Sequence, residues 1–240
     1  MNLRIGNIKL GTKPVVAVSL TDRDINNLRS NLLSLADMIE LRVDMFKNIS
    51  PAHVLNVCER VKQKTGKPVI VTIRTGEEGG KIKIHDYERY RLFKNIIPYA
   101  DAIDIEINSR ISREIVKLGK VYKKIIIGSY HNFKETPDNA FLEIVLAKGK
   151  DTSADIIKLA LYAKNKDDVA RLLGFTIGHK TENIITISMG RFGGISRVIN
   201  PLFGSLIAYT HMRRSTAPGQ LHIAELVKLL QMINPESIMK

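Results

Sequence analysis

The residue of this sequence with the clearest chemical potential is a lysine inside an apolar segment. Lys158 stands between Ile156-Ile157 and Leu159-Ala160-Leu161. An ammonium group is costly to bury unless it is paired, and a desolvated lysine close to other cations becomes a nucleophile toward a carbonyl carbon near neutral pH. Three arginines could supply the neighbouring positive charge: Arg42, Arg74 and Arg197. A structural ion pair of the lysine with Glu40 or Glu106 is the alternative, and both interpretations stay open at this point.

A histidine that directly follows another apolar segment is the candidate for moving protons. His131 comes immediately after Ser129-Tyr130 at the end of a run of isoleucines, and histidine changes its charge near neutral pH. A proton shuttle also needs an acceptor that orients the ring, and Glu78 in the acidic, glycine-rich segment after Arg74 is the predicted one. The histidines of the sequence lack the spacings typical of zinc sites, so the sequence predicts no metal site.

The polar segment from residue 190 to residue 220 contains groups that suit an organic acid. Arg197 matches a carboxylate geometrically, whereas the side chains of Thr216 and Gln220 can bind hydroxyl groups. Gly193-Gly194 before a helix is also compatible with a phosphate site, although this glycine signal is weak on its own. A loop that holds no ligand is the remaining interpretation.

The elements that must position these residues alternate regularly. Short segments rich in valine and isoleucine predict eight strands, at 15–20, 38–43, 69–74, 102–106, 125–130, 155–161, 184–188 and 206–210. Segments of helical period predict the helices between and after them, at 24–35, 51–64, 86–97, 109–120, 137–148, 166–173, 195–203 and 221–233. Ser50-Pro51 and Thr136-Pro137 are predicted to cap two of these helices. Eight such units in 240 residues predict an α/β protein with a (β/α)₈ TIM barrel, in which functional side chains lie at the carboxyl ends of the strands.

Two features of the amino-terminal part refine this prediction. Residues 1–11, with a turn at Gly6-Asn7, predict a hairpin that closes the barrel floor. No Gly-x-Gly-x-x-Gly motif follows the strand at 15–20, so dinucleotide binding is not supported, and an open doubly wound sheet is the alternative fold. Without a linker or a tandem repeat, residues 1–240 are interpreted as a single barrel domain.

The composition limits the cellular setting. The chain has 37 Lys and Arg against 24 Asp and Glu, which gives a net charge of +13. The basic residues are scattered and mixed with acids and match no nucleic-acid-binding module, so we expect no nucleic-acid partner. One cysteine, Cys58, excludes an intrachain disulfide, and no run of 18 apolar residues is present, so we expect a cytoplasmic protein without a membrane partner.

Taken together, the segments resemble the type I 3-dehydroquinate dehydratases, the Schiff-base enzymes of the shikimate pathway. The resemblance is carried by residues 39–44 (Ile-Glu-Leu-Arg-Val-Asp), 72–75 with 78–80, 129–133 (Ser-Tyr-His-Asn-Phe), 155–158, 187–190 with 196–197, and 203–205 with 217–220 (Ala-Pro-Gly-Gln). It implies a (β/α)₈ barrel lyase, usually a homodimer, that converts 3-dehydroquinate to 3-dehydroshikimate and water without a metal or organic cofactor.

The same resemblance implies roles for individual residues. Lys158 would form the imine, His131 would act as general acid and base, and Glu78 would orient His131. The residues that would bind the substrate's hydroxyls and carboxylate are Ser19, Glu40, Arg42, Arg74, Arg197, Thr216 and Gln220, and Met189 and Phe203 would line the pocket. A class I aldolase on the same fold, a binding module without turnover and a nucleic-acid binder remain as alternatives.

Overall fold

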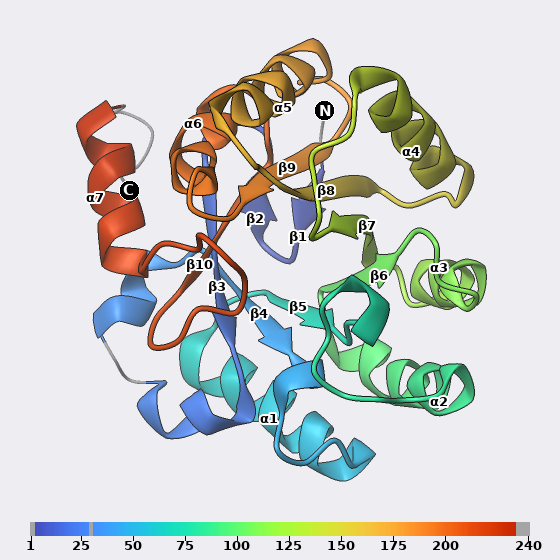
Figure 1. Cartoon of the computed structure of the whole chain (residues 1–240). Helices are drawn as coiled ribbons and strands as arrows, with labels where there is room; N and C mark the ends of the chain where they lie inside the picture. The colour runs from blue at the N-terminus through green and yellow to red at the C-terminus, as the bar shows by residue number, and fades with distance from the viewer. Residues whose placement is uncertain (1–2, 29–30, 234–240) are drawn as a thin grey trace.

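The computed structural model describes residues 3–28 and 31–233, and eight strands within them form one parallel sheet (Figure 1). The strands are β3 (Val15–Leu20), β4 (Met38–Arg42), β5 (Val69–Thr72), β6 (Ala102–Glu106), β7 (Ile125–Asn132), β8 (Ile156–Tyr162), β9 (Ile184–Met189) and β10 (Ile207–His211). From β3 to β9 each strand pairs with the next in the chain, and β10 pairs with β3. The barrel closes between β9 and β10, where the backbone N–H of Leu206, just before β10, donates to the carbonyl of Ile184 at 2.9 Å. The predicted (β/α)₈ barrel is confirmed. The doubly wound alternative is wrong, because the strand order contains no reversal.

Helices follow the strands and pack around the outside of the barrel (Figure 1). They are α1 (Pro51–Thr65), α2 (Asp86–Ile96), α3 (Ser112–Val121), α4 (Asn139–Asp151), α5 (Lys166–Gly178), α6 (Ser196–Leu202) and α7 (Ile223–Ile233). No helix in the described part of the chain has the length and apolar character needed to cross a membrane.

Several details of the helix prediction are wrong. The side chain of Ser50 makes no capping hydrogen bond at the start of α1, α3 begins at Ser112 and not at residue 109, and α5 continues to Gly178 and does not end at residue 173. The predicted helix at 24–35 is instead two short 3₁₀ helices, η1 (Asp22–Asn27) and η2 (Asn31–Leu35), with residues 29–30 outside the described part. Asparagine and serine in this segment compete for backbone hydrogen bonds and disfavour a continuous helix. The helix after Thr136-Pro137 begins later, because Asp138 caps α4 by accepting from the backbone N–H of Phe141 at 2.8 Å. Thr136 Oγ1 donates to the carbonyl of Tyr162 instead.

A hairpin closes the amino end of the barrel, as predicted. Strands β1 (Arg4–Ile5) and β2 (Ile8–Lys9) pair in antiparallel fashion across a turn in which Gly6 has a φ of +56°. Ile5 and Leu10 are buried among the apolar residues that face the barrel interior at this end, such as Val15. Residues 1 and 2 of the predicted hairpin lie outside the described part.

The inward-facing side chains change character along each strand. On β6 the inward residues pass from Ala102 to Asp104 and Glu106, and on β8 they pass from Ile156 to Lys158. Parallel register places Ser129 of β7 beside Lys158. The lower barrel is therefore an apolar core on the hairpin, and the upper barrel holds buried charges at the carboxyl ends of the strands.

Candidate active site

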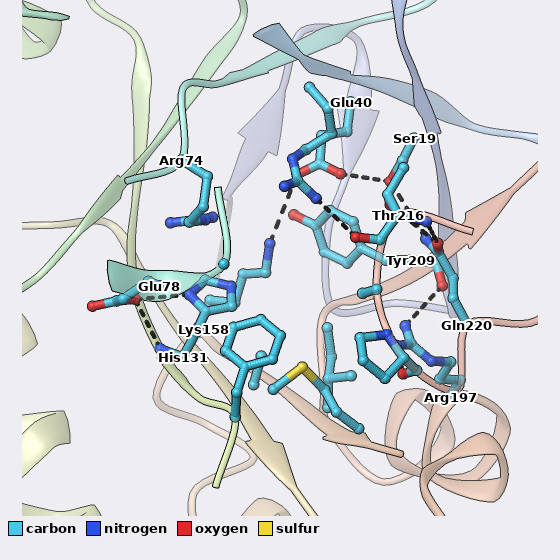
Figure 2. A pocket seen from close by; sticks show the side chains of 18 of the residues that line it. Ser19, Glu40, Arg74, Glu78, His131, Lys158, Arg197, Tyr209, Thr216 and Gln220 are labelled. Atoms are coloured by element: carbon cyan, nitrogen blue, oxygen red, sulfur yellow. Dashed lines mark hydrogen bonds and ion pairs between the residues drawn. The ribbon is translucent and has the colours of Figure 1, made fainter. Parts of the chain in front are cut away.

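A cavity of about 310 Å³ opens at the carboxyl ends of the barrel strands (Figure 2). It brings together eleven of the twelve residues predicted from the sequence, namely Ser19, Glu40, Arg42, Arg74, Glu78, His131, Lys158, Met189, Arg197, Thr216 and Gln220. They come from the strands, from α6 and from the loops that follow β5 and β10. Segments far apart in the sequence thus contribute polar groups to one enclosed space.

Phe203 lies elsewhere, and its prediction as a pocket residue is wrong. It follows α6, its side chain is exposed, and it borders a hollow shared with Pro14 and Leu206. A helix that follows a strand returns the chain to the amino end of the barrel, so a residue between α6 and β10 lies at the opposite rim from the site. Ala160, Ile187 and Tyr209 supply apolar lining in addition to Met189.

Lys158 lies at the base of the cavity with its amine almost fully buried. Its Nζ is 2.9 Å from Asp104 Oδ2, 3.8 Å from Glu40 Oε1 and 4.0 Å from the centre of the Tyr209 ring. The ion pair with Glu40 fits the structural alternative in part, whereas Glu106 pairs with Arg74 and Arg89 instead. The lysine is therefore held by carboxylates and still borders the cavity.

The loop after β5 folds tightly to place Glu78 beside His131. The 3₁₀ turn η4 (Gly76–Glu78) ends at Gly79 with a φ of +87°, and the N–H of Gly80 donates to the carbonyl of Thr75 at 2.7 Å. A Cβ on Gly80 would lie only 2.0 Å from the carbonyl oxygen of Arg74. The glycines are required by this close backbone approach.

Glu78 and His131 form a buried pair. Glu78 Oε2 accepts from the backbone N–H of His131 at 2.9 Å and lies 2.9 Å from its Nδ1. Burial raises the pKa of Glu78 to about 8 against the opposing effect of Arg74, and burial together with Arg74 and Lys158 lowers the pKa of His131. The imidazole is therefore uncharged at neutral pH and can accept a proton at one ring nitrogen while the carboxyl group supports the other.

The three arginines of the site differ in their partners. Arg42 makes a two-pronged contact with Asp44, at 3.0 Å and 2.9 Å. Arg74 contacts Asp104 at 2.7 Å and Glu106 at 2.9 Å. Both charges are compensated within the protein.

Among the described residues, no carboxylate pairs with the buried Arg197. It donates to the carbonyls of Gly219 at 2.9 Å, Tyr209 at 3.2 Å and Pro218 at 3.3 Å. Burial lowers its pKa to about 10, and only the more distant Glu40 opposes this effect. Carbonyl dipoles orient the guanidinium but do not neutralise it, so this position favours an anionic ligand group.

Ser19, Glu40, Thr216 and Gln220 form a hydrogen-bonded group on the rim next to β3. Ser19 Oγ donates to Glu40 Oε2 at 2.6 Å, and Gln220 Oε1 accepts from the backbone N–H of Thr216 at 2.7 Å. The loop that follows β10 carries both Thr216 and Gln220 across the mouth of the barrel (Figure 1). These groups can accept from or donate to hydroxyls of a ligand.

Three residues of this region were given no role from the sequence. Asp104 and Tyr209 contact Lys158 from opposite parts of the barrel, and Phe133 borders the cavity beside His131. Strand alternation is the signal that could have identified the first two, because each faces inward one step above an apolar residue.

Two further ligand classes find no support. Gly193 is explained by backbone packing, since a Cβ there would lie 2.1 Å from the carbonyl oxygen of Ser188. Within the described ranges, no group of three or more His, Cys, Asp or Glu side chains is arranged to hold a metal ion.

Comparison with known proteins places the chain among barrel enzymes. The profile of the type I 3-dehydroquinase family matches residues 16–237. A 3-dehydroquinate dehydratase of Thermodesulfovibrio yellowstonii is 40% identical over 220 residues, which cover 92% of this chain and 96% of that protein.

Solved structures agree with this assignment. The 3-dehydroquinate dehydratase from Geobacillus kaustophilus matches with a TM-score of 0.89 and 28% identity, covering 98% of this chain and 97% of that one. The type I enzyme from Clostridium difficile, solved with covalently modified comenic acid, matches with a TM-score of 0.87 and 28% identity, covering 98% of each chain. Because the profile and the relatives span nearly the whole barrel and its site, the chain belongs to the type I 3-dehydroquinase family.

Proposed function

We propose that the chain is a 3-dehydroquinate dehydratase that converts 3-dehydroquinate to 3-dehydroshikimate and water through an imine on Lys158. One observation carries this proposal: the buried amine of Lys158, the uncharged ring of His131 and the uncompensated cation of Arg197 border one cavity. A keto acid needs these three groups, one for the ketone, one for a proton and one for the carboxylate.

The amine of Lys158 is the nucleophile in this mechanism. After losing its proton, Nζ attacks the ketone carbon, and the resulting carbinolamine loses water to give the imine. A protonated imine withdraws electrons better than a ketone, which makes the hydrogen on the neighbouring carbon more acidic. No metal or organic cofactor is needed as an electron sink.

His131 moves the protons of the later steps. It takes the carbon-bound proton to give an enamine, and the electron pair then expels the hydroxyl group on the next carbon, which leaves as water with a proton from His131. Water finally hydrolyses the imine, so the net change is the loss of one water molecule and Lys158 is regenerated. Glu78 holds the ring through Nδ1 during these transfers.

The other side of the cavity holds the substrate. Arg197 binds the carboxylate, because it is the buried cation whose contacts in the described structure go only to carbonyls. Glu40, Ser19 and Gln220 bind hydroxyls, with Thr216 supporting Gln220. Arg42 and Arg74 contribute positive charge near the ketone while paired with their carboxylates.

An absorbance assay tests the proposed activity. The product is a conjugated enone and absorbs where 3-dehydroquinate does not, so the purified chain should produce a rising signal. Lys158→Ala should abolish it, and Lys164→Ala is the matched control, because Lys164 is exposed and pairs only with Glu135 at 3.0 Å among the contacts described. Binding without an enone would favour a binding module, and carbon–carbon cleavage products would favour an aldolase. Either outcome would refute the proposal.

We further propose that residues 1–240 act as one catalytic domain in a cytoplasmic homodimer, in line with the family resemblance. Analytical ultracentrifugation of the purified chain at micromolar concentration should give the mass of two chains. A sedimenting species with the mass of one chain would contradict the dimer.

A further inference from the structure

A fully buried arginine lies on the outer side of the barrel, on α2. Arg89 has no exposed surface, and its guanidinium stacks over Phe93 at 5.4 Å. Its Nε donates to the carbonyl of Ile73 at 2.7 Å, its Nη1 donates to Ser109 Oγ at 3.1 Å, and its Nη2 pairs with Glu106. A charge buried to this degree is costly unless it is paired, and Glu106 is the carboxylate that compensates it.

Glu106 connects Arg89 to the residues inside the barrel. Its second oxygen, Oε1, accepts from Arg74 Nη1 at 2.9 Å and from the backbone N–H of Thr75 at 3.0 Å. Arg74 in turn donates to Asp104 Oδ1 at 2.7 Å and to Ser129 Oγ at 2.7 Å. The other oxygen of Asp104 accepts from Lys158 at 2.9 Å.

These contacts form a line of alternating charges that includes Lys158, the proposed nucleophile. The order is Arg89, Glu106, Arg74, Asp104, Lys158 and Glu40, with cations and anions in turn. Every member is nearly or fully buried, so neighbouring charges interact strongly and are screened little by salt. Adding or removing one charge at the outer end therefore changes how firmly Asp104 holds the ammonium group.

We propose that Arg89 is a positioning residue for Lys158, which it influences through Glu106, Arg74 and Asp104. Without the charge of Arg89, Glu106 interacts more strongly with Arg74. Arg74 then neutralises less of the negative charge of Asp104. The ammonium of Lys158 is then held more strongly, and a higher pH is needed to release its proton. This inference rests on the proposed imine at Lys158.

Other charged groups also face the amine, and they stay unchanged in the test below. They are Glu40 on β4, His131 on β7, the Tyr209 ring on β10 and, through Arg74, Glu78 on the loop after β5. Arg89→Met and Glu106→Gln keep all of these groups, but the charge of Glu106 also raises the pKa of Glu78. Arg89→Met leaves Glu106 in place and is therefore the more specific variant.

The test is the rate of the borohydride-trapped adduct with 3-dehydroquinate, measured between pH 5.5 and 9 on folded protein. Arg89→Met should slow adduct formation about tenfold at the acid end of this range and by less at the alkaline end, because loss of the cation strengthens the hold of Asp104 on the ammonium group. Arg91→Met is the matched control, since Arg91 lies on the same helix, is exposed and stacks on Tyr87 at 5.8 Å. It should leave the profile unchanged.

Glu106→Gln provides a second variant with the opposite sign. It removes a negative charge from the same line, so the acid side of the profile should move to lower pH. This result remains decisive where Arg89→Met fails to fold. A profile equal to that of the wild type in either variant, with only a lower melting temperature, would overturn the inference. Failure of the wild type to trap any adduct would instead refute the proposed imine, so the two failures are distinguishable.

Discussion

The two sides of the cavity treat buried positive charge differently. On the side of β5, β6 and β8, Arg74 and Lys158 each have a carboxylate within 2.9 Å. On the side of α6 and β10, the hydrogen bonds of Arg197 within the described part of the chain go to carbonyl oxygens, and burial lowers its pKa to about 10. The positive charges of the first side are compensated without a ligand, whereas Arg197 on the second side gains a negatively charged partner when an anion binds.

This difference separates positioning from binding. Paired charges hold Lys158 and leave little freedom for its amine, which suits a nucleophile that must meet one carbon atom. An unpaired cation is unfavourable when buried and becomes favourable with a carboxylate, which suits recognition of an acid. Each of the following predictions changes one side and leaves the other intact.

Among variants that keep Lys158, His131→Ala should have the largest effect on the reaction. General acid and base groups contribute about a hundred- to ten-thousandfold, so turnover should fall by at least that range. Lys158 can still attack the ketone, and a covalent substrate or product imine should accumulate and be visible by intact mass. Near-normal turnover, or solvent exchange of the carbon-bound proton at the wild-type rate, would contradict the role of His131.

Arg197→Met and Arg74→Met should separate the two sides most directly. Arg197→Met should raise the KM about ten- to a hundredfold, because charge-assisted bonds contribute about 1.5–3 kcal/mol, and it should cost little stability. Arg74→Met should lower the free energy of unfolding by about 3–5 kcal/mol, because Asp104 and Glu106 lose their shared cation. Steady-state kinetics and urea unfolding check both variants.

The reverse pattern would invalidate the comparison. If Arg197→Met left the KM unchanged and destabilised the fold more than Arg74→Met, the carboxylate would bind elsewhere, with Arg74 as the next candidate.

Of these variants, Glu78→Gln should have the smallest effect on turnover. Its effect on the melting temperature depends on pH. Burial raises the pKa of Glu78 in the folded protein to about 8 from an ordinary value near 4.5. Between these values the folded chain binds more protons than the unfolded chain, so this contribution to stability is lost as pH rises through the window. The variant cannot ionise, and its melting temperature relative to the wild type should rise between pH 4.5 and pH 8.

Thermal unfolding at pH 4.5, 6, 7.5 and 9 measures this difference. It should increase by about 10 °C or more over this range, at about 1.4 kcal/mol per unit of pKa and about 2–4 °C per kcal/mol. Turnover should fall less than in His131→Ala, because the ring remains and only its orientation and basicity change. A difference in melting temperature that is constant or shrinks with pH would show that the Glu78 carboxyl is already ionised in the folded state.

Much of the fold follows from local sequence pattern. The strands are rich in valine and isoleucine, which is typical of parallel strands buried on both faces. Lys158 and Glu40 are conspicuous because they interrupt such strands. The two 3₁₀ helices η1 and η2, where a single helix at 24–35 was predicted, could not be foreseen in the same way. The segment has apolar residues at helical spacing but also asparagine and serine, which break a helix.

The contacts between the site residues could not be predicted from the sequence. Asp104 and Lys158 are 54 positions apart and meet only because the barrel brings β6 and β8 together. Arg89 resembles a surface arginine of a charged helix, and nothing local indicates that it is buried against Glu106. The prediction for Phe203 was wrong because the sequence does not show at which end of the barrel a residue near a strand lies. Phe203 follows α6, which returns the chain to the amino end of the barrel, and the site is at the carboxyl end.

Peptide mapping after borohydride reduction in the presence of 3-dehydroquinate tests the central claim most directly. The imine on Lys158 should be reduced to a stable amine, and the mass increment of the reduced adduct should lie on the peptide containing Lys158 in fully inactivated enzyme. Protein that is fully inactivated while its Lys158 peptide keeps its unmodified mass would contradict the imine mechanism.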